Sequence, residues 1–144
     1  MGESMREVVA AIDRLASVRA PNDLARLQEL AERYFALPEA PEHLGVWFRL
    51  YERFPEDDAF GVFWTVLHGV EAQPNFEQLV IESVRRRPSG FPVRMVNGLL
   101  NAGIRQVGGV QLLELLQEVA GDDRSPPGLR EEAVGFLEYQ RSQS

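Results

Sequence analysis

The residues that could carry acid–base, nucleophilic or metal chemistry are few in this sequence, and their spacing matches no common catalytic or metal-binding motif. The two histidines, His43 and His68, show neither an HExxH nor an HxH spacing and fall on different expected helices. Cysteine is absent, which excludes disulfides, thiolate metal sites and cysteine nucleophiles. All 15 basic residues are arginine, which excludes a Schiff-base lysine and a P-loop lysine. We therefore expect no bound metal and no cofactor.

The hydroxyl and carboxyl side chains also lack a catalytic arrangement. The serines stand mostly at expected helix ends, and Ser83, the exception, has no nucleophile-elbow pattern around it. The acidic pairs Asp57-Asp58, Asp122-Asp123 and Glu131-Glu132 are adjacent residues that point in different directions, so we interpret them as compensation for helix dipoles. Gly108-Gly109 is interpreted as a tight turn rather than a phosphate-binding loop. The sequence thus predicts that the protein is not an enzyme.

Composition is typical of one globular domain, which we place at residues 1–144. Hydrophobic residues make up 44% of the chain and charged residues 26%, and 15 basic against 22 acidic residues give a net charge of -7. This charge disfavours direct nucleic-acid binding and favours a basic protein partner. The only basic run, Arg85-Arg86-Arg87, is interpreted as a solvated helix end. The first apolar stretch is interrupted by Asp13 and Arg14, so we expect no membrane contact and a cytoplasmic protein.

The elements that would position any site are helices, because apolar residues recur at helical spacing nearly everywhere. About eight helices are expected. The fourth carries Phe60, Phe63, Trp64 and Val66 and is apolar over most of its circumference, so we expect it to be the most buried. Gly103 is expected to close the sixth helix in the left-handed conformation. The helices form consecutive pairs at about residues 4–37, 42–73, 75–104 and 109–140.

The pairs resemble one another and repeat at roughly 33 to 36 residues, which is typical of stacked helical hairpins. Two second helices begin with Pro92-Val93-Arg94 and Pro127-Gly128-Leu129-Arg130, similar to the proline, hydrophobic residue and arginine of HEAT repeats. The pair at about residues 42–73 departs from the pattern, because its second helix begins near Ala59-Phe60-Gly61, which has no arginine. We therefore predict an all-α fold, a degenerate HEAT-like α-solenoid of stacked antiparallel helical hairpins.

Polar residues at spacings of three and four lie on the second helices of the pairs. Thr65 and His68 mark one such stripe, and Arg94, Asn97 and Asn101 mark another. The stripes have two interpretations. They form one partner-binding strip, or they are the solvent-exposed faces of amphipathic helices, in which case Arg94 braces neighbouring repeats. Asparagine is a poor helix former, and this slightly favours a functional role for Asn97 and Asn101.

The C-terminal half resembles small helical immunity proteins encoded beside polymorphic or contact-dependent toxins in GC-rich bacteria. The likeness centres on Glu82 to Ala120, at Arg87-Pro88-Ser89, Met95-Val96-Asn97, Leu99-Leu100-Asn101 and Val107-Gly108-Gly109. It implies a cytoplasmic, single-domain protein that binds a cognate toxin domain, often a basic nuclease, and blocks its active site or substrate surface. Such families have no catalytic residues to transfer to this chain.

The candidate partner-binding residues are the polar strip and the acidic turns, whose carboxylates would attract a basic toxin. They are Glu56, Asp57, Asp58, Thr65, His68, Arg94, Asn97, Asn101, Asp122 and Asp123. A helical-repeat adaptor that binds a peptide or protein subunit is the alternative. A third possibility, an enzyme with an unrecognised site, requires a deep pocket that gathers His68 with carboxylates. The oligomeric state stays open.

Overall fold

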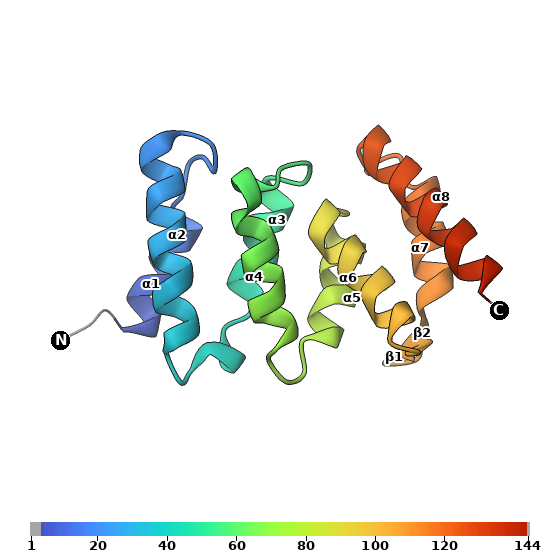
Figure 1. Ribbon diagram of the computed structural model, residues 1–144, viewed down its shortest axis with the longest axis horizontal. Helices are drawn as coiled ribbons and strands as arrows, with labels where there is room; N and C mark the ends of the chain where they lie inside the picture. The colour runs from blue at the N-terminus through green and yellow to red at the C-terminus, as the bar shows by residue number, and fades with distance from the viewer. Residues whose placement is uncertain (1–3, 144) are drawn as a thin grey trace.

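The computed structural model describes residues 4–143, in which the chain forms eight α-helices, two short 3-10 helices and one small hairpin (Figure 1). The predicted all-α fold is confirmed; residues 1–3 and 144 of the predicted domain lie outside the described residues. The elements are α1 (Met5–Asp13), α2 (Pro21–Ala36), η1 (Ala40–Glu42), α3 (Gly45–Arg53), η2 (Ala59–Gly61), α4 (Val62–Glu71), α5 (Glu77–Arg86), α6 (Gly90–Asn101), β1 (Gln106–Val107), β2 (Val110–Gln111), α7 (Leu112–Gly121) and α8 (Pro127–Ser142).

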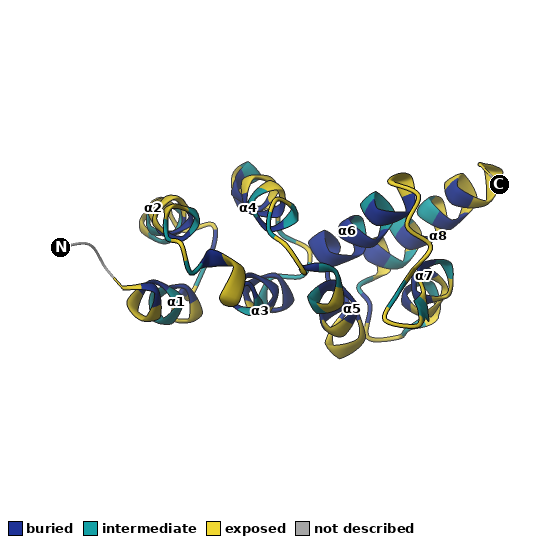
Figure 2. Cartoon of the chain, turned by 90° about the horizontal axis from the view of Figure 1, so that it is seen from below, coloured by how far each residue is buried: buried dark blue, intermediate teal, exposed yellow. Residues whose placement is uncertain are grey.

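The helices stand in two rows, and the chain alternates between them. The first row holds α1, α3, α5 and α7, and the second row holds α2, α4, α6 and α8 (Figure 2). Neighbours within the second row are in contact, α2 with α4, α4 with α6, and α6 with α8. The two ends of the chain lie at opposite ends of the stack (Figure 1). The HEAT-like character of the repeats stays a prediction.

An aromatic cluster joins the rows near the middle of the stack. The rings of Tyr51 on α3 and Phe91 on α6 are stacked with their centroids 5.3 Å apart. Phe63 on α4 packs edge-on against both, at 4.9 and 5.6 Å. All three rings are at most 1% exposed. Because aromatic pairs in these arrangements add to the free energy gained by burial, this cluster fixes α3, α4 and α6 against one another.

The prediction that the fourth helix is the most buried is wrong. Phe60, which precedes α4, is 63% exposed, and Trp64 within it is 44% exposed. The most extensively buried helix is α6, which contacts α3, α4, α5, α7 and α8. The outer side of α4 faces solvent and carries Trp64, Thr65 and His68 (Figure 2).

Local backbone signals explain the turn after α6. Gly103 has a φ of 87° and closes the helix as predicted, with its N–H donating to Leu100 and the N–H of Ile104 donating to Leu99. Gly108 and Gly109 also have positive φ values, of 53° and 80°, and form the two-residue turn of the hairpin, as predicted. The two-residue strands themselves were not predicted, because they are too short to show alternation.

A buried carboxylate ties α3 to α5. Glu52 is 8% exposed and accepts hydrogen bonds from the Ser83 hydroxyl and from Nε and Nη2 of Arg86, each at 2.7 Å. The hydrogen bond to Glu52 raises the pKa of Arg86. Arg85 donates to Glu118 at 3.2 Å. All three arginines of the basic run are exposed at the end of α5, as predicted, and Arg85 and Arg86 form ion pairs there as well.

Replacing two helical glycines by alanine is expected to change the free energy of unfolding in opposite directions. A Cβ at Gly69 would lie 2.6 Å from Cζ of Phe35, whose ring is held by stacking on Trp47 at 5.7 Å. Gly69→Ala is therefore expected to lower the free energy of unfolding by about 1–3 kcal/mol. A Cβ at Gly98 meets nothing closer than 3.5 Å, so Gly98→Ala should raise it by about 0.5–1 kcal/mol. Urea denaturation measures both; a stable Gly69→Ala variant would contradict the packing described.

Candidate functional site

Three carboxylates of the predicted acidic turns accept hydrogen bonds from other groups of the protein. Asp57 accepts from Arg19 Nε at 2.9 Å and from the Ala59 N–H at 2.8 Å. Asp58 accepts from the Phe60 N–H at 3.1 Å. Asp122 accepts from Arg124 at 2.7 Å, and this hydrogen bonding holds the pKa of Asp122 below its ordinary value. These contacts give Asp57, Asp58 and Asp122 a structural role.

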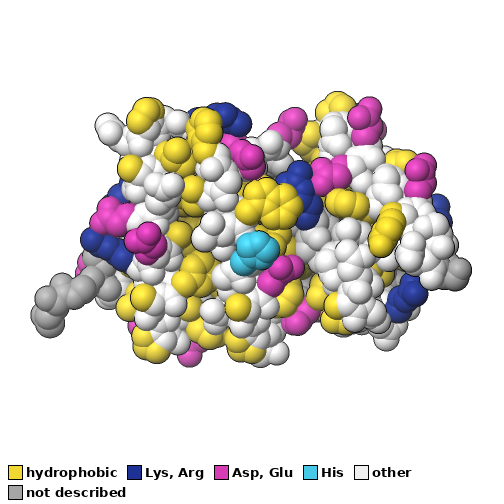
Figure 3. Space-filling view, in the orientation of Figure 1, with side chains coloured by type: hydrophobic (Ala, Val, Ile, Leu, Met, Phe, Trp, Pro, Cys, Tyr) yellow, Lys and Arg dark blue, Asp and Glu magenta, His cyan; other side chains and the backbone are white. Residues whose placement is uncertain are grey.

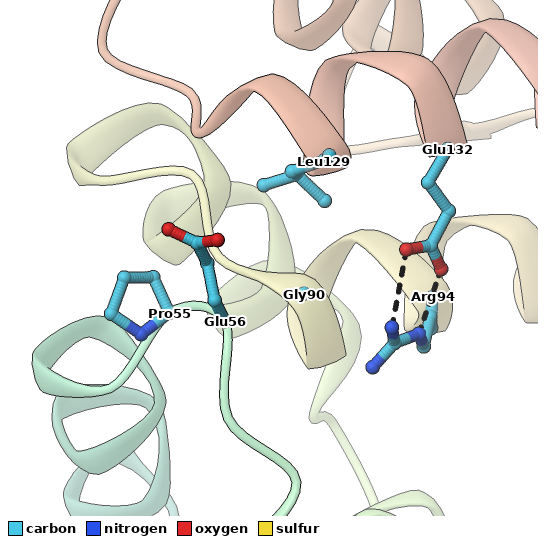
Figure 4. Close-up of a pocket in the computed structure, with 7 residues that line it drawn as sticks. Pro55, Glu56, Gly90, Arg94, Leu129 and Glu132 are labelled. Carbon is cyan, nitrogen blue, oxygen red and sulfur yellow. Dashed lines mark hydrogen bonds and ion pairs between the residues drawn. The ribbon is translucent and has the colours of Figure 1, made fainter.

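The remaining two acidic candidates have different surroundings. Asp123 is exposed in the loop before α8 and lines neither of the hollows beside Arg94. Glu56, in the loop that follows α3, lines a hollow of about 210 Å³ with residues of α6 and α8 (Figure 4). Of the acidic turns, only Glu56 is thus joined to the polar strip.

Arg94 braces α6 against α8, as one of the two interpretations of the polar strip predicted. Its Nε and Nη2 donate to the two carboxylate oxygens of Glu132 at 2.7 and 3.1 Å (Figure 4). Its guanidinium carbon also lies 4.7 Å from the ring centroid of Phe91 and 5.5 Å from that of Trp64. The charge of Arg94 is therefore neutralised by Glu132 within the protein.

Asn97 and Asn101 are joined to α8 by a residue that was not predicted. The side-chain amide of Gln140, which is 5% exposed, donates from Nε2 to Oδ1 of Asn97 at 2.9 Å and of Asn101 at 2.8 Å. The contact uses the oxygen of each asparagine. The amide NH₂ groups of both are left with no acceptor among the described residues, so they remain available as donors.

Arg94, Asn97 and Asn101 line one open hollow between α4, α6 and α8, which we call the α4–α6–α8 groove. Its volume is about 480 Å³, and it adjoins the smaller hollow beside Glu56, since both are lined by Arg94 and Glu132. The second-row face shows hydrophobic side chains bordered by acidic, arginine and histidine side chains near its centre (Figure 3). The remaining lining residues of the groove are Trp64, Leu67, Glu71, Gly98 and Phe136.

Glu71 is the carboxylate of the groove that has no partner. It is partly buried, and within residues 4–143 its carboxylate accepts no hydrogen bond and forms no ion pair. Burial raises the pKa of Glu71, and the nearby charge of His68 opposes this effect. Sequence reasoning did not single out Glu71, because on helical spacing alone it resembles any surface acid.

The other two strip residues lie outside this groove. Thr65 lines a separate hollow of about 470 Å³ between α2 and α4, together with Phe35 and Val62. His68 is exposed and is not among the residues that line the α4–α6–α8 groove. The structure thus separates Thr65, on the α2 side of α4, from Arg94, Asn97 and Asn101, which line the groove on the α6 side.

The groove is suited to binding by its shape and charge. The carboxylates that line the groove and the adjoining hollow are those of Glu56, Glu71 and Glu132, and the one guanidinium that lines them is that of Arg94, so the region is net negative. Among residues 4–143 there is no cluster of three or more histidine and acidic residues that could hold a metal ion, and no helix is long and apolar enough to cross a bilayer.

Comparisons with protein-family models, with curated protein sequences and with solved structures found no match to this chain. A functional assignment therefore rests on the chemistry of the groove and on the sequence resemblance described above. The groove supplies an exposed aromatic ring and an unpaired carboxylate on α4 and amide donors on α6. These groups are typical of a protein-recognition surface.

Proposed function

We propose that this protein is an immunity protein that acts in the cytoplasm by binding a cognate toxin domain through the α4–α6–α8 groove. The observation that carries the proposal is the 44% exposed Trp64 at the edge of a net-negative groove. Tryptophan is enriched among the residues that dominate binding free energy in protein interfaces. The identity of the partner as a toxin rests on the resemblance of residues 82–120.

The charge of the chain supports a basic partner. The net charge of -7 would steer a cationic protein toward this surface and raise the association rate. The association rate is therefore expected to fall as salt is added, whereas the dissociation rate changes little. Binding would neutralise the toxin by covering its active site or its substrate surface.

Co-expression tests the proposal. The chain is expressed in bacteria with the toxin-like domain encoded beside it, and growth rescue and co-purification are measured together. The proposal expects rescue with a stable complex; an unrelated toxin is the specificity control and should not be rescued. Failure of both, with the toxin active, would contradict the proposal and favour an adaptor that binds another protein. Rescue without a complex would also contradict direct binding and favour an enzyme.

A further inference from the structure

We infer that the α4–α6–α8 groove is built to receive one arginine side chain of a partner protein, with Glu71 as its counter-ion and the rings of Trp64 and Phe136 beside it. The inference deepens the proposed function, because it names the chemical group that the site takes from its partner. It rests on that function for the identity of the partner only. The site itself can be tested without a toxin.

The charges of the groove call for a cation. Arg94 is occupied by the bidentate contact with Glu132, so that pair contributes no net charge. Glu71 is left as a half-buried carboxylate without a cationic partner among the described residues, and the adjoining hollow adds Glu56. His68 on α4 and the buried Tyr51 on α3 are the other titratable groups that interact electrostatically with Glu71. None of them supplies a permanent positive charge.

The space beside Glu71 is kept open by a glycine. A Cβ placed at Gly98 would lie 3.5 Å from Oε2 of Glu71, so the carboxylate reaches across to α6 at a position without a side chain. Glycine inside a helix costs stability relative to alanine, and here an added Cβ would meet no steric clash. The absence of a side chain at Gly98 is therefore not required by packing. The missing side chain at Gly98 widens the groove next to the Glu71 carboxylate.

The remaining groups favour an arginine within a polypeptide over a small cation. A guanidinium is planar, stacks on aromatic rings and pairs with carboxylates through two hydrogen bonds. The free NH₂ groups of Asn97 and Asn101 would donate to backbone carbonyls on either side of that arginine. A divalent metal ion would need several oxygen ligands, whereas Glu71 offers the one carboxylate without a partner.

The unpaired carboxylate lowers the stability of the free protein. Because burial raises the pKa of Glu71, the charged form is less favourable in the folded chain than in the unfolded chain at neutral pH. Binding of a cation would relieve this cost. A residue that weakens the fold and strengthens binding is typical of a functional position.

The test is an NMR titration with a short neutral-capped peptide that carries one arginine. The chain has two tryptophans, so the indole N–H of Trp64 reports on the groove, and that of fully buried Trp47 serves as an internal reference. We expect a saturable shift of the Trp64 signal with a Kd on the order of 1–10 mM, and no shift of Trp47. The same peptide with citrulline, which has no charge, should bind about tenfold more weakly. Equal binding of the two peptides, or no shift of Trp64, would overturn the inference.

Variants of the acidic residues complete the test. Glu71→Gln should weaken the arginine peptide about tenfold and leave the melting temperature at pH 7 unchanged or higher. Glu138→Gln, an exposed position on α8 with the same change in charge, should bind as the wild type does. Loss of stability in Glu71→Gln, or equal weakening in both variants, would overturn the inference. Gly98→Leu, which fills the groove, should abolish the shift.

The two proposals fail in different ways. If the arginine peptide binds at Trp64 and no toxin domain is bound or neutralised, the proposed function fails and the arginine site stands. If a toxin domain is bound with the same affinity by the wild type and by Glu71→Gln, the arginine site fails and the proposed function stands.

Discussion

Phe91→Ala is expected to lower the free energy of unfolding by about 3–5 kcal/mol, the largest loss of any substitution considered for this protein. The ring is 1% exposed and touches aromatic residues of two other helices, Tyr51 of α3 and Phe63 and Trp64 of α4, at 4.9 to 5.6 Å between centroids. Its removal would leave a cavity where the two rows meet, and rigid neighbours would collapse into it only in part. Urea denaturation followed by circular dichroism measures the effect.

A matched substitution at an exposed phenylalanine shows whether the loss of stability in Phe91→Ala comes from the burial of its ring. Phe60→Ala changes a ring that is 63% exposed, so the free energy of unfolding should change by no more than about 0.5 kcal/mol. Equal losses for Phe91→Ala and Phe60→Ala would mean that the aromatic cluster does not hold the rows together.

Trp64→Ala is expected to weaken the proposed complex with a toxin domain by at least about 2 kcal/mol, or roughly thirtyfold in Kd. Trp64 borders the groove and is partly in water, but its ring packs edge-on against Phe91 at 4.9 Å, so its truncation should lower the free energy of unfolding by about 1–2 kcal/mol, less than Phe91→Ala does. Calorimetric titration with an inactivated toxin domain, alongside thermal denaturation, separates the two quantities.

Val134→Ala provides the control for this result. Val134 is also 44% exposed and lies on α8, yet it does not line the groove, so its truncation should leave the affinity within about twofold of the wild type. Similar losses of affinity in both variants would indicate a diffuse interface. Wild-type affinity in Trp64→Ala would place the partner elsewhere on the molecule.

The helices and their turns were predictable because their signals are local. Gly103 follows the last apolar position of α6, and the observed capping hydrogen bonds run from it and its neighbour back into the same helix. The burial of α4 was not predictable, because an apolar circumference is expected both for a central helix and for a helix with an apolar face left for a partner. The ring of Trp64 is half-exposed in the folded chain, so α4 is not a central helix.

The site was predictable only where its residues share a helix. Asn97 and Asn101 stand one turn apart on α6, and this spacing identified them. Their partner Gln140 is 43 and 39 positions away in the sequence, and Glu132 is 38 positions from Arg94. Such contacts depend on how successive pairs of helices stack, which one sequence does not specify. The acidic turns were predicted as partner-binding residues, but a sequence does not show which carboxylates already accept hydrogen bonds. Asp57, for example, accepts one from the Ala59 N–H.

The central claim is that the second row of helices is the binding face, and NMR shift mapping tests it most directly. The isotope-labelled chain is titrated with the unlabelled, inactivated toxin domain, and shifts are followed for every backbone amide and for both indole N–H groups. We predict that the largest changes fall on α4, α6 and α8, with Trp64 and Asn97 among the most affected residues. Changes confined to α1, α3, α5 and α7, with Trp64 unmoved, would contradict the account.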